Sequence, residues 1–340
     1  RFMALKLHSR RLPTAGKESA RRWLEESGGA ALMDKLSSVF RERGLAGPDI
    51  LFLSTGSTAA SYSLALSRLI GARSATVMTP SVLGTAPFDF AIVPVHDSPE
   101  PADNLFLSLG APNAIDDGKL PGEAEALFSA FPSKSSLRWG VLIGGDDANY
   151  RISPGWIRER IGTLAEKAVE EKADLYVTTS RRTTPEAERA LSDLAARIPV
   201  FRMVLLASKD SSNPVPGILG GCREIFCTED SVSMVSEAAT AGFVVRLLRV
   251  GRKAGLKRIM QSGTAWLVEN KVLPRRFLWG APRFDAMLEG FKEKGLATDA
   301  MPWDQPAQNI ENPEAEKFNE ARDAAAWIIR EWNNKGGDIR

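Results

Sequence analysis

Three segments in the second half of the chain combine glycines, hydroxyl groups, arginines and carboxylates, the groups that bind phosphate in proteins. They are GGDDANY at 144–150, TTSRRTTPE at 178–186 and TEDSVSMVSEA at 228–238. Each of them lies where an apolar run typical of a buried strand gives way to polar residues or to a helical pattern. Ligands of open parallel sheets bind beyond the carboxyl ends of the strands, so we expect the ligand at these turns.

The first two turns offer backbone and guanidinium donors. Gly144 and Gly145 permit a tight turn and a close approach of the backbone to a ligand. Arg181 and Arg182 precede the start of a helix, where a planar guanidinium and oriented N–H groups both favour an anion. An ordinary glycine loop and a solvated arginine pair are the alternative interpretations.

The third turn is the most specific of the three. Asp230 is predicted to cap a helix, and Ser231 and Ser233 fall in its first turn. Glu237 follows Asp230 by seven residues, which places both on one helix face. Such a face offers N–H groups and hydroxyls to a diphosphate and a carboxylate to a ribose diol. A capped helix with apolar residues in the core is the alternative.

Several other chemistries lack their residues. The sequence has no GxGxxG, GxxxxGK[ST] or GxSxG string and no Asp-x-Asp triplet. His8 and His96 do not make a zinc site with Cys222 and Cys227 at any familiar spacing, and the two cysteines do not form a CxxC pair. We therefore expect no obligatory metal or cofactor, and the low cysteine content fits a reducing cytosol.

Length and composition indicate two soluble domains. The chain has 340 residues, more than the roughly 250–300 at which one hydrophobic core stops growing. Its formal net charge of +2 gives no reason to expect nucleic acid as a partner. No apolar stretch of about 20 residues is present that could cross a bilayer, so we expect at most peripheral membrane contact.

Strand and helix patterns alternate from residue 50 onward, as in parallel sheets covered by helices. The Ser- and Pro-containing segment FPSKSS precedes a new strand pattern at Leu137, and we predict the domain boundary within 131–138. The predicted domains are 1–136 and 137–295, followed by a tail at 296–340. The final helix, expected at 314–332, carries Trp327, Ile328 and Trp332 and is expected to pack back on the first domain.

GGDDANY, TSRRT and TEDSVSMVSEA, in that order, resemble the signature loops of the mitochondrial fission Elm family and its bacterial relatives. LSTGSTAASYSLALSRL and FDFAIVPVHD in the first half resemble the family more loosely. The resemblance implies a GT-B-type α/β fold with two facing Rossmann-like domains and a C-terminal helical tail. Relatives carry a further strand, loop and helix before the segment that opens here at Arg1, so the first domain is expected to lack them.

The resemblance also implies a function, that of a glycosyltransferase. The second domain would hold a nucleoside-diphosphate sugar, and the acceptor, a glycan or lipid-linked sugar, would approach from the first. The expected location is the cytoplasm or the inner face of the membrane. The donor-site candidates are Gly144, Gly145, Tyr150, Thr179, Ser180, Arg181, Arg182, Thr183, Thr228, Asp230, Ser231, Ser233 and Glu237.

The first domain supplies two further groups of candidates. Thr55, Gly56 and Ser57 are expected on the acceptor side. His96 and Asp97 end a predicted strand and could act as a catalytic base and its orienting partner. A surface histidine beside a capping aspartate is the alternative reading.

Two other functions remain open at this stage. Non-hydrolysing nucleotide-sugar epimerases can share the fold, and they would convert UDP-N-acetylglucosamine without an acceptor. A non-catalytic adaptor in membrane division would use a docking surface, such as the last helix or the basic and aromatic segment PRRFLWG at 274–280.

Overall fold

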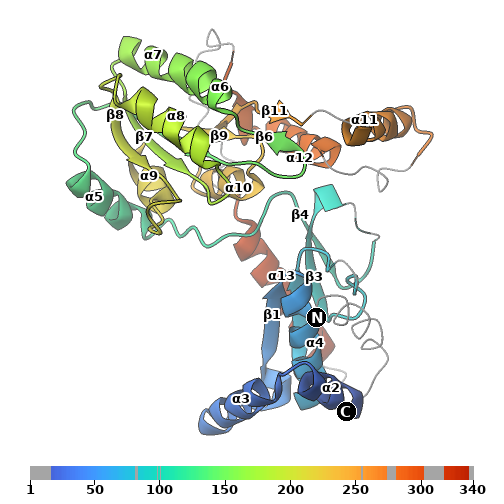
Figure 1. Ribbon diagram of the computed structural model, residues 1–340. Helices are drawn as coiled ribbons and strands as arrows, with labels where there is room; N and C mark the ends of the chain where they lie inside the picture. Colours follow the sequence, from blue (N-terminus) through green and yellow to red (C-terminus); the bar gives the residue numbers. More distant parts are fainter. Residues whose placement is uncertain are drawn as a thin grey trace. The chain divides into compact units, whose positions relative to one another are not determined.

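The computed structural model describes residues 17–80, 83–97, 99, 101–253, 256–273, 281–301 and 318–336 (Figure 1). The chain forms two compact units. Unit 1 comprises residues 1–108 and 323–340, and unit 2 comprises residues 109–322. Both contain parallel sheets covered by helices, which confirms the predicted α/β class with a helical C-terminal tail. Among the described helices, none combines the length and the apolar character needed to cross a membrane.

Unit 1 is built on a four-stranded parallel sheet in the order β1-β2-β3-β4. The strands are β1 (Leu51–Thr55), β2 (Arg73–Val77), β3 (Phe90–Pro94) and β4 (Leu105–Ser108). The helices are α2 (Lys17–Glu26), α3 (Ala30–Glu42), α4 (Ser57–Ile70) and the later part of α13 (Glu320–Gly336), with short 3-10 turns η2 (Gly47–Asp49) and η3 (Val95–Asp97).

Aromatic side chains attach α13 to the sheet of unit 1. The Phe90 ring lies 5.7 Å from Trp327 in an edge-on arrangement and 6.2 Å from Trp332 in a stacked one. Ala324 and Ile328 lie one turn apart on one face of α13, and both belong to the same buried cluster as Phe90. The apolar stripe of the last helix therefore covers one face of this sheet.

Unit 2 has a six-stranded parallel sheet in the order β12-β10-β9-β5-β7-β8. The strands are β5 (Arg138–Ile143), β7 (Asp174–Thr179), β8 (Phe201–Leu205), β9 (Glu224–Thr228), β10 (Val245–Leu248) and β12 (Ala297–Asp299). Chain order runs outward from β5 through β7 to β8, then returns to β9 on the other side of β5. This is the Rossmann order, and its switch point lies between β5 and β9.

Helices and a small ribbon complete unit 2. The helices are α5 (Leu120–Ala130), α6 (Pro154–Trp156), the π-helical turn η4 (Ile157–Ile161), α7 (Gly162–Glu170), α8 (Pro185–Ala195), α9 (Val215–Gly221), α10 (Val232–Thr240), α11 (Leu256–Glu269) and α12 (Ala281–Glu293). β6 (Tyr150–Arg151) and β11 (Gly251–Arg252) pair as an antiparallel ribbon.

The units divide at 108/109, earlier than the boundary at 131–138 that the sequence suggested. The reason is α5, which packs on α9 of unit 2 through glycines. A Cβ atom on Gly220 would lie 2.1 Å from the Leu120 carbonyl oxygen, so the two helices touch backbone to backbone. The division at 295/296 also differs, because β12 is the outer strand of the unit 2 sheet rather than part of a tail.

Candidate functional site

The three sequence-predicted turns meet at the carboxyl ends of β9, β5 and β7. Because these strands are neighbours in a parallel sheet, their ends lie along one edge. Gly144, after β5, donates its N–H to Thr228 Oγ1 at the end of β9, at 2.7 Å. Asp146 N–H donates to the Arg182 carbonyl in the loop after β7, at 3.0 Å. The turns thus form one hydrogen-bonded cluster, the switch-point cluster.

Packing against neighbouring loops leaves no room for a side chain at Gly144 or Gly145. A Cβ atom on Gly144 would lie 2.2 Å from Asp230 Oδ2, and one on Gly145 would lie 2.2 Å from the carbonyl carbon of Arg182. The close backbone approach predicted for a ligand is therefore made in the structure to neighbouring loops. These glycines position the cluster.

Asp230 does not cap a helix, contrary to the sequence prediction. Its Oδ2 atom accepts a hydrogen bond from the Gly145 N–H at 2.9 Å and pairs with Arg182 Nη2 at 3.1 Å. The side chain is wholly buried, and this burial raises the pKa of Asp230 above its ordinary value, against the opposing effect of its hydrogen bonds and Arg182. Asp230 joins the loops after β5, β7 and β9 and is a positioning residue.

The loop after β7 is held by its own hydroxyl groups. Thr183 Oγ1 accepts from the Ser180 N–H at 3.0 Å and donates to the Gly144 carbonyl. The Thr179 hydroxyl donates a hydrogen bond to Glu188 Oε1 of α8 at 2.8 Å, so the Thr179 side chain does not belong to the loop surface. Arg181 is exposed, and its guanidinium has no partner within the described part of the chain. It is the cation of this loop that remains available to an anion.

The amino end of α10 has no side-chain cap. Its N-cap residue Ser231 is buried, and among the described residues no side chain accepts a hydrogen bond from the first turn. A helix leaves its first backbone N–H groups without partners inside the helix, and they carry a partial positive charge. Ser233 is exposed in this turn. The combination is a donor surface for an anion, located at the switch point of the sheet.

Glu237 lies one turn after Ser233 on the same face of α10. It is partly buried, and this burial raises the pKa of its carboxyl group. Among the described residues its carboxylate has no hydrogen-bond or ion-pair partner, so the alternative of a structural tie to an arginine finds no support. A partly buried, unpaired acceptor one turn into the helix can receive hydrogen bonds from the hydroxyls of a ligand.

Tyr150 is fully buried and does not reach the loop surface, which argues against the predicted direct contact with a donor. Its ring packs edge-on against Phe284, with the centroids 6.4 Å apart. Burial is the main cause of its raised pKa, and the charge of Asp285 adds to it. Tyr150 therefore belongs to the hydrophobic core that underlies the switch-point cluster.

Lys253 also lies at this site, although it was not predicted from the sequence. It follows β11, in the loop after β10, and its Nζ donates to the Asp147 carbonyl at 2.7 Å and lies 3.6 Å from Asp146 Oδ2. The loop after β10 is a fourth strand end at the same edge of the sheet, and the pair Arg252–Lys253 was the available signal.

The unit 1 candidates end or follow β1 and β3, at the carboxyl edge of the same parallel sheet. Gly56 is the N-cap of α4 with φ 82°, a left-handed conformation that favours glycine, and Thr55 Oγ1 donates to the Val77 carbonyl at 3.3 Å. His96 lies in the turn η3, only 8% exposed, with Nε2 3.7 Å from Asp97 Oδ1. The imidazole is shielded in this conformation, so a role as base requires a movement that exposes it.

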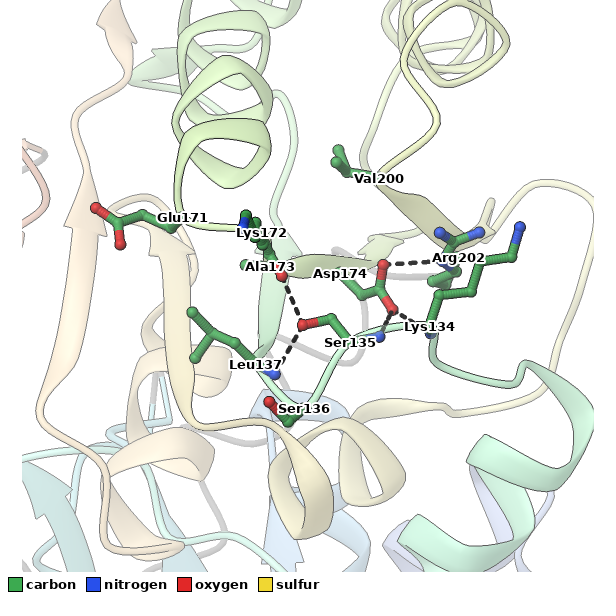
Figure 2. Close-up of a pocket in the computed structure, with 10 residues that line it drawn as sticks. All are labelled: Lys134, Ser135, Ser136, Leu137, Glu171, Lys172, Ala173, Asp174, Val200 and Arg202. Carbon is green, nitrogen blue, oxygen red and sulfur yellow. Dashed lines mark hydrogen bonds and ion pairs between the residues drawn. The ribbon is translucent and has the colours of Figure 1, made fainter.

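A cavity of about 590 Å³ lies at the opposite, amino-terminal edge of the unit 2 sheet (Figure 2). Asp174 lines it and accepts hydrogen bonds from Ser133 Oγ, Arg202 Nε and two backbone N–H groups. Burial alone would raise the pKa of Asp174, but these hydrogen bonds outweigh it and lower the pKa. Asp174 is a structural carboxylate, and this edge is not where parallel sheets bind ligands.

The model of one protein family, described as Mitochondrial fission ELM1, matches residues 3–332. No protein with a curated description matches the sequence. Solved structures that it resembles include a UDP-GlcNAc 2-epimerase from Neisseria meningitidis bound to UDP-GlcNAc, at 14% identity and a TM-score of 0.40, over 77% of this chain and 80% of that one. Another is the UDP-GlcNAc 2-epimerase from Methanocaldococcus jannaschii, at 12% identity and a TM-score of 0.41, over 87% and 80%. Similarity at this level does not identify a reaction.

Proposed function

The chain belongs to the mitochondrial fission ELM1 family, and we propose from this and from the switch-point cluster that it is a glycosyltransferase. In this proposal unit 2 binds a nucleoside-diphosphate sugar, and the sugar moves to a glycan or lipid-linked acceptor. No divalent metal is needed for donor binding. The observation that carries the proposal is the uncapped amino end of α10 at the switch point of a Rossmann-order sheet.

In this proposal the diphosphate binds at the first turn of α10. Backbone N–H groups there, with the hydroxyls of Ser231 and Ser233, donate to the phosphate oxygens. Arg181, exposed in the next loop, supplies a charge-assisted hydrogen bond. Because charge grows on the departing nucleoside diphosphate during glycosyl transfer, these fixed donors stabilise the transition state more than the ground state.

Glu237 is assigned to the nucleoside. A carboxylate that is partly buried and unpaired pays part of its desolvation cost already in the free protein. Hydrogen bonds from two ribose hydroxyls replace the missing partners. This assignment predicts selectivity for nucleoside diphosphates over inorganic pyrophosphate, since the latter cannot use Glu237.

The test is turnover with a panel of nucleoside-diphosphate sugars. Purified protein is incubated with each sugar nucleotide, with and without candidate acceptors, and the products are separated by chromatography. Nucleoside diphosphate released in step with a glycosylated acceptor supports the proposal. Conversion of UDP-N-acetylglucosamine to its epimer without an acceptor contradicts it and identifies an epimerase.

A further inference from the structure

The segment that follows β4 runs along α10, the helix assigned to the donor. Gly110 in this segment is buried, and a Cβ atom on it would lie 2.5 Å from Ser236 Oγ of α10 and 2.7 Å from the ring of Phe291. A side chain would have no room there, so the backbone itself packs against the helix. Residues 109–113 are called the α10 strap.

Two hydrogen bonds fasten the α10 strap to the helix. Ser236 Oγ accepts from the Ala111 N–H at 2.9 Å, and Thr240 Oγ1 accepts from Asn113 Nδ2 at 2.9 Å. Ser236 Oγ also donates to the Val232 carbonyl at 2.8 Å, so it acts as donor and acceptor at once. Both serine and threonine side chains are buried. Removing a buried acceptor leaves its donor without water as a replacement, so these bonds matter more than exposed ones.

The strap meets α10 beside the residues assigned to the ligand. Thr240 follows Ser233 by seven residues and Glu237 by three, which places the three side chains on one side of the helix. Because α10 has 9 residues, about two and a half turns, a shift of its second half also moves its first turn. Fixing Ser236 and Thr240 therefore fixes the donor surface as well.

The other end of the strap is also fixed within unit 2. The Leu109 N–H donates to Glu320 Oε1 at the start of α13, at 2.6 Å, and the Glu320 side chain is buried. The units divide directly before Leu109 and directly after residue 322. This hydrogen bond therefore joins the two stretches of unit 2 that continue into unit 1, and the strap connects both of them with α10.

We propose that the α10 strap positions the donor site, with Ser236 and Thr240 as its positioning residues. The strap holds α10 where its first turn and Glu237 bind the nucleoside diphosphate, and the two hydroxyls act through the helix rather than by contact with the ligand. Because such coupling is reciprocal, a bound nucleoside diphosphate stabilises the strap by the same factor. The ligand in this inference rests on the proposed function, whereas the hold on α10 can be measured without a ligand.

The experiment combines calorimetric titration with hydrogen–deuterium exchange of the full chain. Gly110→Ala forces the strap away from the helix, and Thr240→Val removes the acceptor of Asn113 at nearly constant side-chain volume. Thr240→Ser keeps the hydroxyl and should retain the wild-type affinity. The matched control is Tyr176→Phe, which removes a hydrogen bond of 2.9 Å from the Tyr176 hydroxyl to the Phe131 carbonyl and involves neither α10 nor the strap. The probes are UDP, GDP, ADP, CDP and dTDP.

The wild type and Tyr176→Phe should bind the preferred probe equally. Gly110→Ala and Thr240→Val should each lose about three- to tenfold in affinity, because α10 then spends a smaller fraction of time in the binding position. In the wild type, the bound probe should slow amide exchange across residues 109–113. Wild-type affinity of both folded variants, an equal loss in Tyr176→Phe, or unchanged exchange of the strap on ligand binding overturns the proposal.

Failure of the proposed function gives a different result. If the wild type binds none of the probes, that function fails, and exchange in the free protein decides the role of the strap. Residues 232–240 should then exchange faster in Thr240→Val than in Thr240→Ser, and equal exchange overturns the positioning role. If Gly110→Ala does not fold, the two substitutions at Thr240 carry the same comparison.

Discussion

Replacing Glu237 by alanine separates a ligand-binding carboxylate from a structural one. In the free protein this carboxylate has no partner among the described residues, so the substitution breaks no ion pair or hydrogen bond there. In the complex it would remove hydrogen bonds from ribose hydroxyls to a charged acceptor. Such bonds contribute about 1.5–3 kcal/mol, so affinity for a nucleoside diphosphate should fall about ten- to hundredfold.

The pH dependence of protein stability tests the environment of Glu237 independently of ligand binding. Burial raises the pKa of Glu237 above its ordinary value of 4.5, so at pH values between the ordinary and the raised pKa the folded protein holds a proton that the unfolded chain has lost. Stability due to this group is therefore greatest at low pH and falls as the pH rises from that value through the raised pKa. At neutral pH, Glu237→Gln should leave the melting temperature unchanged or raise it.

The assay is calorimetric titration with nucleoside diphosphates, alongside thermal melting, for the wild type, Glu237→Ala and Glu237→Gln. Glu166→Ala is the matched control, because Glu166 is an exposed glutamate on α7 of the same unit. Its affinity and melting temperature should equal those of the wild type. Unchanged affinity of Glu237→Ala together with a lower melting temperature would refute the assignment, since Glu237 would then act only in the fold.

Three further outcomes are expected. Asp230→Ala should lower the free energy of unfolding by about 1–3 kcal/mol in urea titrations, because it leaves the buried Gly145 N–H without an acceptor; a value near zero would show that the loops hold without it. Gly145→Ala should weaken donor binding and lower the melting temperature, since its Cβ would lie 2.2 Å from the Arg182 backbone, and wild-type behaviour would contradict the close packing. Donor affinity measured in EDTA should equal that in magnesium or manganese, and loss of binding in EDTA would end the metal-independent proposal.

The meeting of the three turns at one edge of the sheet could be predicted from the sequence because it depends on local rules. Apolar runs followed by Gly144-Gly145, Arg181-Arg182 and Ser231 mark the ends of strands, and parallel neighbours bring such ends to one edge. The side-chain roles could not be read in this way. Asp230 has the spacing of a helix cap, but its partners Gly145 and Arg182 are 85 and 48 residues away in the chain. Only packing decides between these alternatives.

The predicted domain boundary at 131–138 differs from the division at 108/109 for a similar reason. The apolar residues of α5 fit a core on either side, and the contact that assigns it to unit 2 is made through Gly217, Gly220 and Gly221 of α9. Glycines inside a helix lower its stability, so three in one short helix were a usable signal of close packing. β12 has three residues, too few to show a period of two. The burial of His96 likewise depends on neighbours that spacing does not reveal.

The most direct measurement of the central claim is an experimental structure of the protein with a bound nucleoside diphosphate. The account predicts the diphosphate at the amino end of α10, within hydrogen-bond distance of first-turn N–H groups, with a ribose hydroxyl on the Glu237 carboxylate. A diphosphate bound instead at the amino-terminal edge beside Asp174, or at the amino end of α4, would contradict it.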